Sequence, residues 1–186
     1  MHMFEPPPPP PKRHTALGVW ALIAAALLAP SLLVWIVRAT ALALQCAPGP
    51  GACHGMALGG GLRDTLNLAW TLGTNSLLLI VLGIAAAIAA LFARQPLLAA
   101  MSVLLLPIAA LVLPTLAVFT TAYSGCAANE GGIGDCKLWG AEMGMAFHTA
   151  ATAPWLLYNI VPYAFSVSIM LGLIGWMFCR ERQTDR

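Results

Sequence analysis

Charged residues are scarce in this chain. Asp, Glu, Lys and Arg make up 9% of its 186 residues, against about 25% in soluble domains, while 60% of the residues are hydrophobic. None of the charged residues falls within the four longest apolar stretches. This composition excludes a soluble globular domain. It also argues against a stand-alone ion-coupled pump, because such proteins place acidic or basic side chains inside the membrane to relay protons or balance charge.

The signatures of several enzyme classes are also missing. The sequence has no glycine-rich phosphate loop, no Gly-x-Ser-x-Gly nucleophile turn and no His-Glu-x-x-His zinc helix. Its histidines and cysteines follow no metal-binding spacing. The net charge of +2 is too small to indicate nucleic-acid binding. We therefore predict no catalytic residues, no bound metal and no other cofactor.

What the sequence does contain is four apolar stretches, each long enough to cross a bilayer as a helix, which takes about 20 residues. They are residues 16–37, 68–93, 97–123 and 155–179. Backbone polar groups in hydrocarbon must be paired within the protein, and a helix achieves this locally. The predicted fold is therefore an all-α integral membrane protein, with four transmembrane helices in an antiparallel bundle. This domain, residues 16–180, lies between a proline-rich basic tail, residues 1–15, and a short tail, residues 181–186.

The distribution of basic residues predicts the orientation of the bundle. If the N-terminus is inside, the cytoplasmic face carries six basic residues: Lys12, Arg13, Arg94, Arg180, Arg182 and Arg186. The opposite face carries three: Arg38, Arg63 and Lys137. Because loops rich in Lys and Arg stay in the cytoplasm, both tails should be cytoplasmic. The alanine-rich composition is typical of a bacterium, so the expected location is the bacterial inner membrane.

Four of the five cysteines form two pairs in the predicted outer loops. Cys46 and Cys53 lie between the first two spans, and Cys126 and Cys136 lie between the last two. Four cysteines allow three pairings, of which pairing within each loop closes the shortest rings. Disulfides form in oxidising compartments such as the periplasm. We expect two short disulfide-stapled exoplasmic loops, with thiol–disulfide exchange as the functional alternative.

Four spans, two cytoplasmic termini and a cysteine pair in each outer loop resemble the layout of the DsbB family of quinone-linked, disulfide-generating membrane proteins. The resemblance covers the whole chain as a layout, and it implies a thiol–disulfide oxidoreductase that uses quinone. That family carries a Cys-x-x-Cys pair followed by an arginine in the first loop, whereas six residues separate Cys46 from Cys53. The wider spacing loses the small ring that tunes a reactive pair. No catalytic role is transferred, and the redox activity remains an alternative.

The beginning of the second span is the most polar part of the membrane domain, and it has polar counterparts in the fourth span. Helical spacing brings the polar residues of the second span to one face, and the fourth span carries similar residues. The set comprises Asn67, Thr71, Thr74, Asn75, Tyr158 and Asn159. Such side chains join membrane helices through hydrogen bonds of about 0.6 kcal/mol each. We predict a helix-packing polar face, directed to a neighbouring span or to a partner subunit.

Local signals predict four further details. Asp64 is expected to cap the second span. The side chain of Arg38 is expected to extend so that its charged end reaches the membrane interface. Residues 141–153 should form a short interfacial helix that ends before Pro154 opens the last span. Two prolines, Pro107 and Pro114, should bend the third span.

The function is predicted by elimination. Small residues on the second and fourth spans allow close helix approach, and they exceed what four helices need for their own packing. The leading hypothesis is a non-catalytic accessory, assembly or scaffold subunit of a larger membrane complex. Its expected partners are the lipid bilayer and other membrane subunits. Besides the redox activity, a small-molecule or lipid transporter component is a further alternative.

Overall fold

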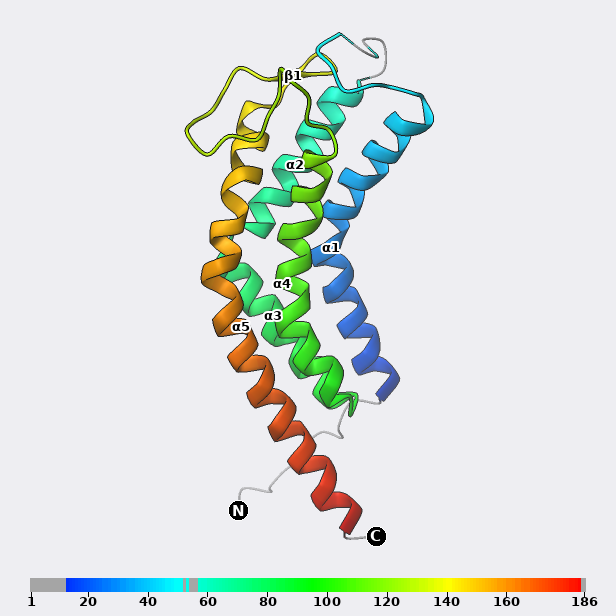
Figure 1. The fold of residues 1–186 in the computed structure, drawn as a ribbon. Coiled ribbons are helices and arrows are strands. Elements are labelled where there is room, and N and C mark those ends of the chain that lie inside the picture. Colours follow the sequence, from blue (N-terminus) through cyan, green and yellow to red (C-terminus); the bar gives the residue numbers. More distant parts are fainter. Residues whose placement is uncertain (1–12, 52, 54–56, 185–186) are drawn as a thin grey trace, which may run out of the picture.

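The fold is an elongated bundle of helices closed at one end by two loops (Figure 1). The computed structural model describes residues 13–51, 53 and 57–184, with the backbone alone for residue 13 and for 178–184. The elements in chain order are α1 (Arg13–Ala43), α2 (Leu58–Gly73), α3 (Ser76–Phe92), α4 (Pro96–Phe119), β1 (Lys137–Leu138), β2 (Ala141–Glu142) and α5 (Gly144–Thr184). The first turn of α1 and the last turns of α5 lie at the end opposite the loops.

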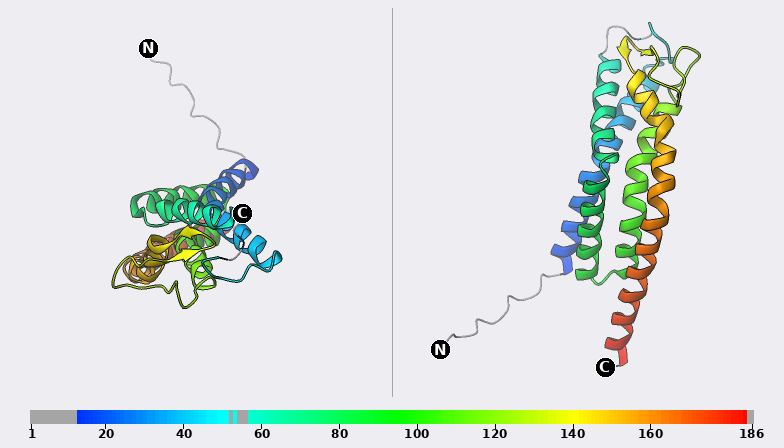
Figure 2. Two further views of the ribbon diagram at one scale, coloured as in Figure 1. Left: turned by 90° about the horizontal axis from the view of Figure 1, so that it is seen from above. Right: turned by 90° about the vertical axis from the view of Figure 1, so that its left-hand side faces the viewer.

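The predicted all-α fold is confirmed, and its helices include candidate membrane spans. Three helices, α1, α4 and α5, are each long and apolar enough to cross a membrane, and the bent pair α2–α3 supplies a fourth crossing if it is counted as one span. In the side view the two halves of this pair follow one another along the bundle (Figure 2). Helix α4 contacts all four other helices, so it forms the axis of the bundle.

The prediction of one continuous helix over residues 68–93 is wrong. The chain is helical from Leu58, but it breaks at Thr74 and Asn75, where α2 and α3 meet at an angle of 73°. The side chain of Asn75 accepts a hydrogen bond of 3.0 Å from the backbone N–H of Leu78 and so caps α3. Asn and Thr side chains compete with helical hydrogen bonds in this way, which explains why the helix stops at this polar segment.

Asp64 does not cap the second span. It lies inside α2 on the surface, where its carboxylate pairs with the guanidinium of the adjacent Arg63 at 3.1 Å. The earlier start of α2 places the glycines at 59–61 in the first turn of the helix. Gly59 lies so close to the β1–β2 turn that an added Cβ would stand 2.5 Å from the carbonyl oxygen of Trp139. The helix therefore begins where a glycine allows it to contact the turn.

The last span also begins earlier than predicted, and the short interfacial helix is absent from the described chain. Residues 141 and 142 form β2, and α5 then runs without interruption from Gly144 through Pro154 and Pro162. Thr152 lies inside this helix, where its hydroxyl donates to the carbonyl oxygen of His148 at 3.2 Å. A long membrane helix tolerates proline because neighbouring groups satisfy the freed backbone.

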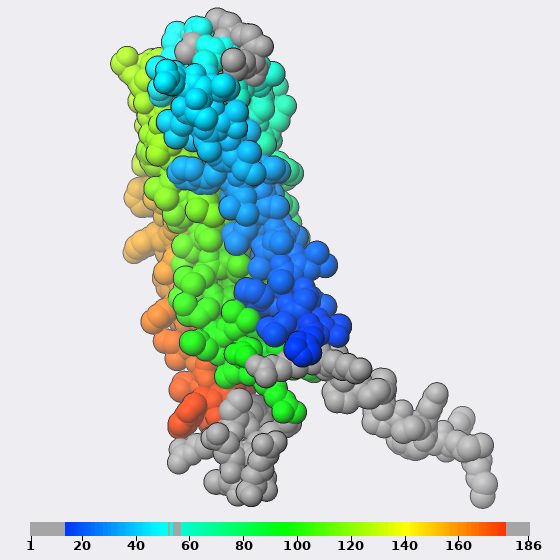
Figure 3. Space-filling model, turned by 90° about the vertical axis from the view of Figure 1, so that its right-hand side faces the viewer, coloured from blue at the N-terminus to red at the C-terminus, as the bar shows by residue number. Residues whose placement is uncertain are grey.

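The first span is longer than the predicted 16–37, since α1 extends from Arg13 to Ala43. It lies along α4 over much of the face in the space-filling view, with α1 in blue and α4 in green (Figure 3). Hydrogen bonds fasten the two helices: the indole of Trp20 donates to the Ser102 hydroxyl at 2.8 Å, and the indole of Trp35 donates to the Leu113 carbonyl at 3.0 Å. Polar bonding within this bundle therefore joins α1 to α4.

The two prolines of the third span lie inside an unbroken α4. Pro114 has no N–H, so the carbonyl of Ala110 lacks its usual helical donor. The hydroxyl of Ser31 on α1 donates to this oxygen at 3.4 Å, and Gly73 at the end of α2 approaches it closely. The freed carbonyl is thus contacted by two neighbouring helices.

Candidate functional site

The looped end of the bundle forms a compact cap that contains both disulfides. Cys46 bonds to Cys53, with Cα atoms 6.0 Å apart, and Cys126 bonds to Cys136, with Cα atoms 4.9 Å apart. Of the three pairings that the sequence allows, the structure has the one that closes each loop on itself. The two loops are therefore stapled separately, and any contact between them depends on other bonds.

Those other bonds come from a tight hairpin. Trp139 and Gly140 connect β1 to β2 with φ angles of 49° and 80°, the left-handed conformation at both central positions that a two-residue hairpin turn favours. The backbone N–H groups of these two residues donate to Gly49 at 2.9 Å and Pro50 at 3.1 Å. The indole of Trp139 donates to Ala47 at 3.0 Å. Three hydrogen bonds thus fasten the first loop to the second.

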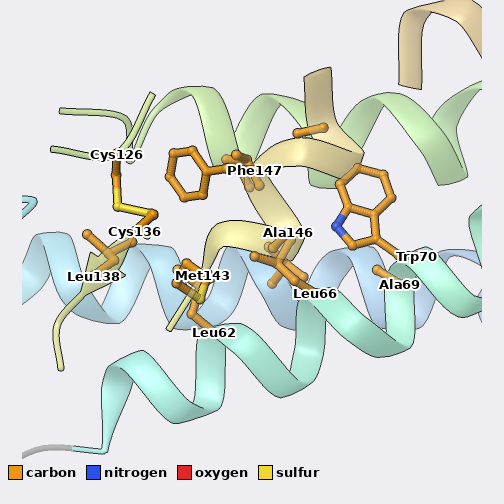
Figure 4. Packing of buried hydrophobic residues seen from close by; sticks show 14 of the residues in the cluster. Leu62, Leu66, Ala69, Trp70, Cys126, Cys136, Leu138, Met143, Ala146 and Phe147 are labelled. Atoms are coloured by element: carbon orange, nitrogen blue, oxygen red, sulfur yellow. A yellow bond between two sulfur atoms is a disulfide. The ribbon is translucent and has the colours of Figure 1, made fainter. Parts of the chain in front are cut away.

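A small hydrophobic core lies beneath this cap (Figure 4). Four of its side chains are fully buried: Phe147 of α5, Met143 just before α5, Leu138 of β1 and Leu62 of α2. The Cys126–Cys136 disulfide lies at one edge of this cluster, with both cysteines buried. The cap is therefore a packed unit, and its second disulfide is part of the core.

Arg38 lies buried close to the cap and does not extend to the interface as predicted. Its guanidinium donates to the carbonyl of Thr120 at 2.9 Å and to the hydroxyl of the same residue at 3.4 Å. Thr120 is the C-cap of α4. A cation at this position satisfies the terminal carbonyl groups and the negative end of the helix dipole. Arg38 therefore fixes α1 to the end of α4.

The cap offers little access for thiol chemistry. Cys46, Cys126 and Cys136 are buried, and Cys53 is half-buried. A shallow hollow of about 90 Å³ lies beside the second disulfide, and His148 on its rim makes a 3.0 Å hydrogen bond through Nδ1 to the backbone oxygen of Asn129. Across the described residues, no group of three or more His, Cys, Asp and Glu side chains is placed to hold a metal ion.

Differential access leads to a prediction about reduction. A thiolate must reach a sulfur atom to open a disulfide, so Cys46–Cys53 should be reduced before Cys126–Cys136. In intact cells treated with increasing dithiothreitol and then a thiol-specific mass tag, the first pair should be tagged at lower concentration. The second pair should react only when the fold is lost. Simultaneous reduction of the two pairs would contradict this order.

The second candidate site is a cleft between α3, α4 and α5, with a volume of about 280 Å³. Its lining is mostly aliphatic, and none of the described residues in it is charged. The lining residues are Ser76, Leu79, Ile80, Gly83, Ile84, Val103, Pro107, Asn159, Ile160, Tyr163, Ala164 and Val167. Such a lining is suited to holding an apolar molecule and lacks the groups needed for acid–base catalysis.

The cleft lies halfway along the bundle. Pro107 on its wall is at the middle of α4, which runs from Pro96 to Phe119. Nearer the end opposite the cap, Gly175 packs against Pro96, and the Ser168 hydroxyl donates to Ala100 at 2.7 Å. If the apolar length of α4 spans the bilayer, the cleft lies at the bilayer centre.

The predicted polar face lies near this depth, but its described hydrogen bonds do not join α2 to α5. The hydroxyl of Thr71 donates to Asn67, and that of Thr74 donates to Trp70. The amide of Asn159 donates to Trp155. All six residues of the set, Asn67, Thr71, Thr74, Asn75, Tyr158 and Asn159, are exposed on the surface of the chain. A face directed to a partner remains a prediction.

Comparison of the chain with protein-family models, with curated proteins and with solved structures found no match. The functional argument therefore depends on the geometry of the cap, the helix break and the cleft.

Proposed function

We propose that this chain is a non-catalytic accessory or assembly subunit of a larger complex in the bacterial inner membrane, with both termini in the cytoplasm. The observation that carries the proposal is the helix break between α2 and α3. Residues 74–77 are all exposed, although they lie beside the middle of α4. Broken backbone at membrane depth is tolerated where protein or a polar cavity covers it, because lipid cannot pair its N–H and C=O groups.

The surface of α5 supports the same proposal. Only 17% of its most apolar stretch is buried, against 39% for α4. Tyr158 and Tyr163 are 76% and 78% exposed, and both lie well inside the apolar part of the helix. A tyrosine hydroxyl at this depth favours a hydrogen-bonding partner over lipid tails. A partner helix that lies along α5 and also covers the helix break would supply hydrogen-bond partners for the tyrosine hydroxyls and for the exposed backbone groups.

Site-specific photocrosslinking tests this proposal. A photoreactive amino acid is placed at Thr71 on α2, at Tyr158 on α5 and, as a control, at Leu22 on α1, which is 71% exposed and apolar. In native membranes, the first two positions should crosslink to the same protein, as identified by mass spectrometry. Leu22 should crosslink to lipid alone. Equal labelling at all three positions, or different proteins at Thr71 and Tyr158, would contradict the proposal.

A second candidate is the thiol–disulfide oxidoreductase, favoured by the half-buried Cys53 in the otherwise buried set of cysteines. It requires that Cys46–Cys53 cycles in cells and forms a mixed disulfide with a periplasmic protein. Thiol tagging of growing cells without added dithiothreitol detects the first event, and a non-reducing gel of the Cys46→Ser variant detects the second as a band of higher mass. A first pair that stays oxidised throughout growth would exclude this candidate.

A further inference from the structure

The cleft between α3, α4 and α5 changes in polarity along its length. At the end nearer the cap it is bordered by Ser76 and Asn159, with Tyr163 one turn further along α5. At the other end it is bordered by Ile84, Val103 and Val167. One end therefore offers hydroxyl and amide groups at its mouth, and the other offers hydrocarbon alone.

The hydrogen-bonding capacity at the polar end is only partly used. Asn159 donates one amide N–H to Trp155, which leaves its side-chain oxygen as an acceptor. Ser76 is the first residue of α3, just after the capping Asn75, and its hydroxyl is exposed. In hydrocarbon these groups are stabilised by a ligand with oxygen atoms of its own.

The depth of the cleft restricts the kind of ligand. The headgroup of a phospholipid lies at the membrane surface, about 15 Å from the bilayer centre, since the hydrocarbon core is about 30 Å thick. The polar end of the cleft lies near the centre. A phospholipid chain from the leaflet opposite the cap would place its terminal methyl group against Ser76 and Asn159, where the polarity does not match.

Charge and volume restrict it further. None of the described lining residues is charged, so a charged head would be bound without compensation. The volume of about 280 Å³ lies near the lower limit for small-molecule pockets, so the cleft has room for one lipid chain but not for two. Gly83 borders open space, because a Cβ added there would meet no atom within 4 Å.

We propose that this cleft binds an uncharged, single-chain lipid with a compact oxygen-containing head, of the long-chain alcohol class, for which geranylgeraniol serves as the probe. The head lies between Ser76 and Asn159, and the chain extends along Gly83 towards Ile84 and Val167. The proposal does not require the accessory-subunit function, because one chain forms the cleft; a partner helix over the helix break would lie against Ser76 at the mouth of the same cleft.

Photolabelling of the purified full-length chain in phosphatidylcholine nanodiscs tests it. The probe is geranylgeraniol that carries a diazirine, and the labelled residues are mapped by mass spectrometry. Wild-type protein should be labelled within 76–84 and 159–167, and excess unlabelled geranylgeraniol should prevent the labelling. Gly83→Leu fills the cleft and should lower the labelling about tenfold, equivalent to 1.4 kcal/mol of binding free energy.

Gly18→Leu is the matched control, because Gly18 is likewise a helical glycine, in α1, with no atom within 4 Å of an added Cβ, and it lies outside the cleft. This variant should keep wild-type labelling. Val167→Phe narrows the cleft from α5 and provides a second blocking variant if Gly83→Leu folds poorly. Unchanged labelling in a folded blocking variant would overturn the proposal. Labelling that unlabelled alcohol fails to compete would also overturn it, since phospholipid chains would then occupy the cleft.

Discussion

Replacing Gly59 by alanine should lower the free energy of unfolding by about 2–3 kcal/mol, which is near the upper end of the usual range for overpacked sites. The new Cβ would lie 2.5 Å from the carbonyl oxygen of Trp139 and 2.8 Å from that of Leu138. Both obstacles are backbone atoms of a turn that three hydrogen bonds hold to the first loop. The turn cannot yield without breaking those bonds, so α2 must move away from the cap.

The chain supplies its own controls for this effect. Gly60 and Gly61 follow in the same turn of α2, and a Cβ at either position meets no atom within 4 Å. Gly60→Ala and Gly61→Ala should each stabilise the helix by about 0.5–1 kcal/mol, because alanine loses less backbone entropy on folding. Thermal unfolding in a mild detergent, followed by tryptophan fluorescence, compares the three variants. Equal midpoints for Gly59→Ala and Gly60→Ala would refute the close contact.

Removal of the buried disulfide should have an effect of similar or greater size. The double variant Cys126→Ala/Cys136→Ala should lose about 2–5 kcal/mol of stability, the usual range for a native disulfide. The loss has two sources. The ten-residue separation between the cysteines is no longer closed in the unfolded chain, and the two missing sulfur atoms leave a void beside Leu138 and Phe147.

The other disulfide provides the comparison. Cys46→Ala/Cys53→Ala opens a loop of similar length, with a separation of seven residues, but Cys53 is only half-buried. The loop also keeps its hydrogen bonds to Trp139 and Gly140. This variant should therefore lose less stability than the first, as measured by the detergent unfolding midpoint. A reversed order would show that the cap depends on its first loop more than on its core.

Hydropathy alone was sufficient to predict the helical membrane domain and the approximate positions of its spans. The reason is that a span must satisfy its own backbone, so a long apolar segment without charge has few alternatives to a helix. Pairing of cysteines within each loop was also accessible from sequence, because short separations close easily. These features depend on residues that are near one another in the chain.

The features that the sequence did not predict depend on competition between local and distant groups. The sequence predicts one polar helix face around Asn75, whereas the side chain of Asn75 accepts a hydrogen bond from the backbone of Leu78 and ends the preceding helix there. The sequence also predicts a helix start at Pro154, but α5 continues through it from Gly144. In both cases the residue type is compatible with two local structures, and the surrounding packing determines which of the two forms.

The cleft was the least predictable site. Its lining combines short segments of α3, α4 and the more distant α5, and most of its residues, such as Ile80 and Val103, are ordinary apolar residues of a span. Pro107 and Gly83 were the signals available, since each stood out against its apolar surroundings. These two residues line the same cleft only because the bundle brings α3 and α4 together.

The hydrogen bonds between the two loops set an order for biosynthesis. The indole of Trp139 and the carbonyl of Ala47 are 92 residues apart in sequence, and α2, α3 and α4 lie between them. In the proposed orientation, the first loop crosses the membrane early, and it gains its bonded neighbours only after the second loop has been translocated. Until then its backbone is open to proteases and to oxidants of thiols. Resistance of the first loop to protease therefore reports that the nascent chain has completed its last translocation step.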